Sequence, residues 1–198
     1  EGALGDKKLA AARTLLSKLK KNDDSVYGDM SGEYNDVILR YLRKTELAKS
    51  VEEIDGVLSA LNEELALVKT QLEVEKQQAL SDFNDFISSR VYDDEGESII
   101  NGVKNRAENE VKAATTLKQL NSVREKYLGT DEQPGLFETS CDTYNTKAKN
   151  ELYNEFIYDK TYSADDTARI ISCYEKWAIK LDNADSREKI EAAFADAR

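Results

Sequence analysis

Apolar side chains recur along this chain at steps of three and four residues, in three copies with matching offsets. In the middle copy the stripe consists of Ile100, Val103, Ala107, Val111 and Ala114. In the last copy it consists of Ile170, Cys173, Trp177, Leu181 and Ala184, and in the first, more weakly, of Tyr34, Val37, Tyr41, Thr45 and Ala48. Residues at these steps share one face of an α-helix, so each copy is predicted to contain an amphipathic helix that ends just before a small alanine.

A second helical segment is predicted before each stripe, and a third after it. Upstream, the middle and last copies match at identical offsets, with Phe83, Phe86 and Ile87 against Tyr153, Phe156 and Ile157, and the first copy offers Leu9, Leu15, Leu16 and Leu19. Downstream of each alanine stands a hydroxyl that caps a new helix by accepting a backbone N–H: Ser50, Thr116 and Ser186. The three alanines are 66 and 70 residues apart, so we infer one three-helix unit that occurs three times.

These patterns predict an elongated all-α protein of three tandem three-helix bundles. The units are predicted at residues 6–70, 71–128 and 136–198, and are called below the first, middle and last copy. Residues 50–90 contain no Pro and only Gly56 interrupts them, so we expect the third helix of the first copy to continue into the first helix of the middle copy. The turn-forming stretch 129–135, GTDEQPG, predicts a hinge or short linker.

The composition is typical of helices, and it disfavours nucleic acids and membranes as partners. The 198 residues include a single Pro, and 34% are charged. The net charge of −11 disfavours binding to phosphate backbones, and the basic cluster at Lys18, Lys20 and Lys21 is typical of a helix end, so no nucleic-acid partner is expected. No window approaches the ~20 apolar residues that cross a bilayer, so no membrane insertion is expected. Because the chain begins at Glu1 and its one Met is Met30, we expect that its start was trimmed, as a removed leader or by design.

The side chains present argue against catalysis and metal binding. The chain has no His, which removes the commonest general base and metal ligand. The densest acidic run, DDEGE at 93–97, follows a predicted loop and opens a predicted helix, where acids complement the helix dipole. It lacks the ligand spacing of an EF-hand, as does 23–33. We therefore predict no catalytic, cofactor or metal site, and interpret 93–97 as a solvated helix start.

Cysteines and aromatic residues are interpreted mainly as packing. Cys141 and Cys173 are predicted to be free thiols, with Cys173 a small core residue in the position of Val103. Tyr27, Tyr92 and Tyr162 recur in the loop after the first helix of each copy, and each is expected to pack its ring over that end of the helical hairpin. Tyr144 and Tyr158 lie off the repeat pattern, and are candidate partner-binding residues if exposed.

The run from Tyr162 through Ile170, Cys173, Trp177, Leu181, "ADS" and Ile190 resembles the helical repeats of large secreted and cell-wall proteins of Gram-positive bacteria, as does the run from Tyr92 to Leu120. These are clostridial-type, FIVAR-like three-helix bundles in tandem. The pattern departs from that module at Thr45, Cys173 and Arg187. The resemblance implies a secreted or surface-exposed, non-catalytic interaction or spacer region.

Three classes of function follow as hypotheses. The leading one is a binding, adhesion or spacer segment of a secreted or surface bacterial protein, with a protein or glycan partner. The alternative is an intracellular helical scaffold or adaptor whose apolar groove binds a partner helix. An all-α enzyme would need several carboxylates with perturbed pKa values in one cleft, and no pattern in the sequence indicates one.

Overall fold

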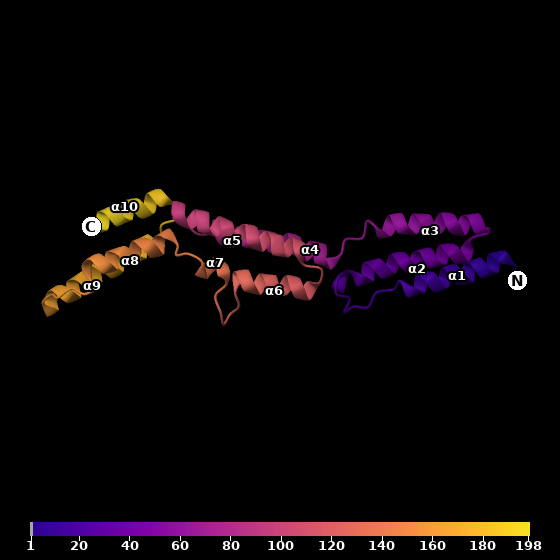
Figure 1. Cartoon of the computed structure of the whole chain (residues 1–198), viewed down its shortest axis with the longest axis horizontal. Helices are drawn as coiled ribbons and strands as arrows, with labels where there is room; N and C mark the ends of the chain where they lie inside the picture. The colour runs from indigo at the N-terminus through magenta and orange to yellow at the C-terminus, as the bar shows by residue number, and fades with distance from the viewer. Residues whose placement is uncertain (1) are drawn as a thin grey trace. The chain divides into compact units, whose positions relative to one another are not determined.

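The computed structural model describes residues 2–198, and every regular element in that range is a helix (Figure 1). The predicted all-α class is therefore confirmed. The chain divides into two compact units. One contains the residues up to Gln78 together with Ala113–Ser122, and the other contains Ala79–Lys112 together with Val123–Arg198.

The first unit is built around three helices that pack against one another: α1 (Ala3–Ser17), α2 (Ser31–Leu47) and α3 (Val51–Leu65). A short 3-10 helix, η1 (Gly28–Met30), precedes α2. Leu15 of α1 and Leu61 of α3 meet the buried face of α2, which consists of Tyr34, Val37, Ile38 and Tyr41. The weaker stripe of the first copy is thus a true core face, and Thr45 is buried with its hydroxyl donating to the carbonyl of Leu42.

The predicted continuous helix between the first and middle copies is wrong. Helix α3 ends at Leu65, and α4 (Gln71–Ser88) begins after a break at residues 66–70. The hydroxyl of Thr70 accepts a hydrogen bond from the Glu73 N–H, and the Glu73 carboxylate accepts one from the Thr70 N–H at 2.9 Å. This reciprocal capping box satisfies two donors that a helix start leaves unpaired, so a new helix starts here without any Pro.

The remaining helices are α5 (Asp94–Ala113), α6 (Leu117–Leu128), α7 (Leu136–Thr139), α8 (Tyr144–Phe156), α9 (Ala164–Asp182) and α10 (Arg187–Ala197). The middle stripe lies on α5 and, with Ala114, directly after it; it is buried along its whole length, as predicted. Residues 129–135 form a closed turn in which Gly129 has a positive φ of 89° and pairs with Pro134. The one-turn helix α7 follows directly and buries Phe137 completely.

In the last copy, α8, α9 and α10 pack on one another around Leu152, Leu181 and Ile190. Only the end of the stripe is buried, with Leu181 0% and Ala184 9% exposed. Ile170 and Trp177 are half-buried and Cys173 is exposed, so the predicted core position of Cys173 is wrong.

The predicted match of Tyr153 to Phe83 is also wrong, by one residue. Leu152 takes the buried position, whereas Tyr153 is 41% exposed. The Tyr158 N–H donates to the carbonyl of Tyr153, and Asp159 has a left-handed φ of 53°. The end of α8 is therefore irregular, and the chain leaves the helix before Tyr162. Tyr162 is 41% exposed, whereas its counterpart Tyr92 in the middle copy is 4% exposed.

We predict that Thr70→Ala lowers the free energy of unfolding by about 1 kcal/mol, because the mutation removes the side-chain cap of α4. Urea denaturation followed by far-UV circular dichroism measures this difference. Ser59→Ala, at an exposed position inside α3, is the matched control and should leave stability nearly unchanged. Equal stabilities of the two variants would contradict the capping assignment.

The unequal burial of equivalent stripe positions leads to a second prediction. Ile100 is 1% exposed, so Ile100→Ala should cost about 2–5 kcal/mol of unfolding free energy. Ile170→Ala should cost less than half as much, because its side chain is only half-buried. Equal losses in the same denaturation assay would contradict this difference between the copies.

Candidate functional site

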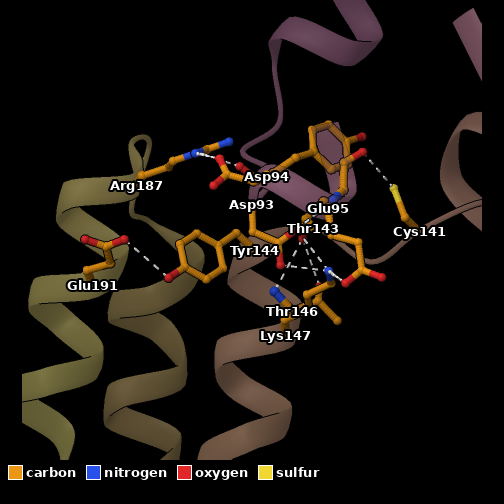
Figure 2. Close-up of polar contacts among 12 residues, drawn as sticks. Asp93, Asp94, Glu95, Cys141, Thr143, Tyr144, Thr146, Lys147, Arg187 and Glu191 are labelled. Carbon is orange, nitrogen blue, oxygen red and sulfur yellow. Dashed lines mark hydrogen bonds and ion pairs between the residues drawn. The ribbon is translucent and has the colours of Figure 1, made fainter. Parts of the chain in front are cut away.

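The loop before α5 meets the first turns of α8 and α10, and polar contacts concentrate there (Figure 2). The Tyr144 N–H, at the start of α8, donates to the carbonyl of Val91 at 2.8 Å. The Nε of Arg187, at the start of α10, donates to the carbonyl of Tyr92 at 2.7 Å. Val91 also packs against the apolar cluster of the last copy. We call this set of contacts the 91–97 junction.

Asp93 is the central carboxylate of this junction. One of its oxygens accepts the Gly96 N–H at 2.7 Å and so caps α5, and both oxygens accept from Nζ of Lys147, at 2.8 and 3.0 Å. The Lys147 ammonium, followed by the Gly96 amide, lowers the pKa of Asp93 below its usual range. Asp93 in turn raises the pKa of Lys147. Both groups are therefore charged at neutral pH.

Arg187 makes a second ionic contact across the junction. Its guanidinium donates to Asp94 at 2.6 Å, and its Nη2 lies 2.8 Å from Glu97. The hydrogen bond to Asp94 raises the pKa of Arg187 further. The prediction of a solvated helix start at 93–97 is thus partly correct, since Asp93 caps the helix. The acids of this segment also form ion pairs with Lys147 and Arg187 of the last copy. The sequence signal for this ionic contact was Arg187, because it places a charge where the middle copy has the apolar Leu117.

The two predicted partner-binding tyrosines stand at opposite ends of α8 and do not form one patch. Tyr144 is half-buried against the last copy's cluster, and its hydroxyl donates to Glu191 at 3.4 Å. Burial, and then Glu191, raise the pKa of Tyr144. Tyr158 follows the end of α8 and is 65% exposed. Tyr144 therefore belongs to the junction, whereas Tyr158 is an accessible aromatic side chain.

The two cysteines are free thiols in the structure, as predicted. The Cys141 thiol lies beside the junction, with Sγ donating to the carbonyl of Gly96 at 3.7 Å. Burial raises its pKa, so the protonated thiol predominates at neutral pH and Cys141 is a poor nucleophile.

The last copy carries an apolar groove of about 570 Å³, between α8, α9 and the end of α10. Its apolar wall consists of Leu152, Phe156, Ile170, Cys173, Tyr174 and Trp177. Arg169 and Arg198 lie at its rim, and Arg198 pairs with Glu155 at 2.7 Å. Sequence reasoning missed this groove because it assigned the stripe of the last copy to a closed core.

Two further properties bear on the site. Among residues 2–198, no three His, Cys, Asp or Glu side chains converge in a way that could hold a metal ion. Within the same range, no helix is both long enough and apolar enough to span a bilayer. Compared with known proteins, the chain matches no family model, and no curated protein or solved structure shows significant similarity to it.

The charge of Asp93 leads to a pH-dependent prediction. Because its folded pKa is lowered, the Asp93 charge stabilises the fold at pH values above its ordinary pKa of about 3.9, and this contribution is lost as the pH falls from there through the folded value. Asp93→Asn keeps a capping oxygen but removes the charge, so it should cost about 1 kcal/mol at pH 7. The difference from the unmodified protein should shrink towards zero in urea denaturation near pH 2.

Asp85→Asn is the matched control. Asp85 lies exposed on α4, so this mutation removes the same charge at a position away from the junction. A loss of stability that is equal at pH 7 and at low pH would show that the Asp93 charge does not stabilise the junction.

Proposed function

We propose that this chain is a non-catalytic helical repeat region that acts as a binding or adhesion module or as a spacer. In this proposal it is an elongated array of three tandem three-helix bundles within a secreted or surface-exposed bacterial protein. Its partner is a protein or a glycan. The resemblance of residues 92–120 and 162–190 to surface repeats supports the location, and the helix contacts described below support the mechanism.

The observation that carries the proposal is a pair of junctions built on the same plan. In the first, the loop before η1 accepts two backbone N–H groups from helix starts: Leu72 of α4 donates to Val26 at 3.0 Å, and Leu117 of α6 donates to Ser25 at 2.9 Å. In the second, the loop before α5 accepts the backbone N–H of Tyr144 from the start of α8 and the side-chain Nε of Arg187 from the start of α10. Both junctions join the loop after a copy's first helix to the first and third helices of the next copy.

The first junction also explains why a glycine stands at position 28. Gly28 has a φ of +47°, and a Cβ there would lie 2.0 Å from Oε1 of Gln71. That oxygen accepts the Asp29 N–H at 2.6 Å. A side chain at position 28 would therefore both strain the backbone and displace the contact between loop and helix start.

Such junctions favour a display or spacer role because each one sets the register of two neighbouring bundles. Hydrogen bonds between defined backbone atoms have short range and strict geometry, so each junction restrains how its loop and the two helix starts meet. Exposed faces of successive bundles would then be held at a fixed spacing towards a partner.

A non-catalytic role is supported by the chemistry of the acidic loop. The chain contains no His, and all four acids of 93–97 form ion pairs with Lys147 or Arg187, with the pKa of Asp93 lowered. A general acid at neutral pH needs a raised pKa instead. Hydrolysis of a test substrate that disappeared on mutation of one carboxylate would contradict this role.

The alternative function, an intracellular scaffold or adaptor that binds a partner helix, is favoured by the apolar groove of the last copy. Fractionation of the native cells distinguishes the two functions. Recovery in the cell wall or medium supports the surface module, and recovery in the cytoplasm supports the adaptor.

We predict that small-angle X-ray scattering will give a radius of gyration clearly above about 16 Å, the value for a compact domain of this length. Light scattering on the same sample checks that the protein is monomeric. A monomer with a radius near the compact value would contradict the tandem array.

A further inference from the structure

The two junctions hold corresponding helix starts by contacts of different chemistry. At the first, Leu117 of α6 donates its backbone N–H to Ser25, and its side chain lies against Gly28, where a Cβ would stand 2.9 Å from Cδ1 of Leu117. At the second, the corresponding residue at the start of α10 is Arg187, which reaches the carbonyl of Tyr92 with its side-chain Nε. A guanidinium therefore takes the place of an apolar side chain and a backbone donor.

Four ion pairs cross the 91–97 junction, and each joins an acid of the loop or of the first turn of α5 to a base of the last copy. They are Lys147–Asp93 (2.8 Å), Lys147–Glu95 (3.8 Å), Arg187–Asp94 (2.6 Å) and Arg187–Glu97 (2.8 Å). The side chains of Asp94 and Glu95 are 95% and 80% exposed. Dissolved salt reaches such pairs and weakens them, so much of the attraction across this junction depends on ionic strength.

The corresponding contacts of the first junction are made by uncharged groups. The Leu72 and Leu117 backbone N–H groups donate to loop carbonyls, and Oε1 of Gln71 accepts the Asp29 N–H at 2.6 Å. Neutral hydrogen bonds carry no net charge for salt to screen. The first junction is therefore expected to hold over a range of salt that weakens the second.

The last copy has a core of its own that does not require the ion pairs. Helices α8, α9 and α10 pack on one another around Leu152, Leu181 and Ile190, and Val91 of the junction packs against this cluster as a partly buried neighbour. Loss of the loop contacts would thus remove one apolar neighbour and leave the three helices packed. The helix starts can part from the loop without unfolding of the bundle.

We propose that the 91–97 junction is a salt-sensitive joint. At low ionic strength its ion pairs hold the starts of α8 and α10 on the loop, and at high ionic strength they release it while the last copy stays folded. The inference rests on the proposed function as a surface-exposed display or spacer module, because the salt of the medium would then act directly on this joint. It adds that one junction of the module is adjustable and the other is not.

Hydrogen exchange of two backbone amides, followed by NMR, tests the joint. Tyr144 and Leu72 both lie in the first turn of a helix, where an N–H has no acceptor within the helix, and each donates to a loop carbonyl of the preceding copy. Their exchange rates therefore report the opening of the second and the first junction. The comparison is between about 10 mM and about 1 M NaCl, which shortens the Debye length from about 30 Å to about 3 Å.

We expect the Tyr144 amide to exchange at least about fivefold faster at the higher salt concentration, because several ion pairs weaken together. The Leu72 amide should change less than about twofold over the same range, since its junction is neutral. Leu72 makes the same kind of hydrogen bond in the same protein sample. It therefore corrects for any effect of salt on the exchange chemistry itself.

Two matched variants assign the salt response to the junction. Arg187→Gln removes one of the two bases, so Tyr144 should exchange faster at low salt and respond to added salt less than about half as strongly. Arg169→Gln removes the same charge at an exposed position near the start of α9, and the full salt response of Tyr144 should remain. Lys147→Gln removes the other base and is the alternative if Arg187→Gln does not fold.

Three outcomes would overturn the inference: equal salt responses of Tyr144 and Leu72, an undiminished response in Arg187→Gln, or loss of protection at the buried Leu152 and Leu181 amides together with Tyr144. The last of these would mean that salt unfolds the last copy instead of opening the joint. The scattering measurement is independent of these results. An elongated monomer whose Tyr144 amide ignores salt loses this inference but keeps the proposed array, and a compact monomer with the expected salt response does the reverse.

Discussion

The second helix of each copy carries an apolar stripe that a single neighbouring helix cannot cover, and the surrounding structure depends on how that stripe is buried. Fully burying a side chain such as Ile38 or Ile100 contributes about 1.5–3 kcal/mol, so a stripe of four or five such positions dominates the stability of a small helical bundle. In the first copy α1 and α3 supply the cover. In the last copy Ala197 takes the place of Tyr127, and Ile170 and Trp177 on the stripe stay half-buried. The groove is therefore a direct consequence of the same burial constraint.

The junctions solve a second physical problem, that of the backbone groups at helix starts. The first N–H groups of a helix have no partner within the helix, and a loop carbonyl that leaves water needs a donor. Leu72, Leu117 and Tyr144 all lie in the first turn of a helix, and each donates its N–H to a loop carbonyl of the preceding copy. Each contact pairs a donor that lacks an acceptor with an acceptor that lacks a donor.

The two junctions share one kind of backbone contact, from the start of the next copy's first helix, and differ in the other: Leu117 donates its backbone N–H, whereas Arg187 donates its side-chain Nε. At the first, the side-chain contact is a neutral one through Gln71, whereas at the second Asp93 and Asp94 meet Lys147 and Arg187. Asp93 and Lys147 are half-buried, so salt weakens their attraction somewhat less than that of a fully exposed pair. At the second junction, ion pairs therefore add to the contacts between loop carbonyls and helix starts.

Most of the helical architecture was predictable, because burial of a helix face leaves a period of three and four residues in the sequence. The errors came where a local hydrogen bond or a missing neighbour decided the outcome. A capping box at Thr70 broke a helix that lacked any Pro, and the open side of the last copy left Cys173 exposed although it continues the stripe. The 91–97 junction was only half predicted, since a helix start with acids is visible in the sequence but the bases that meet it come from α8 and α10, about 50 and 90 residues further on.

By itself, the sequence determined the helical class and the side chains of α2 and α5 that face a core, since these follow from the spacing of apolar residues within one helix. Only the tertiary structure decided which acids pair with which bases, where Tyr144 is held, and that one stripe out of three remains partly open. The reason is that spacing encodes the contacts of a helix with its own face, whereas cover and charge pairing depend on atoms contributed by distant segments.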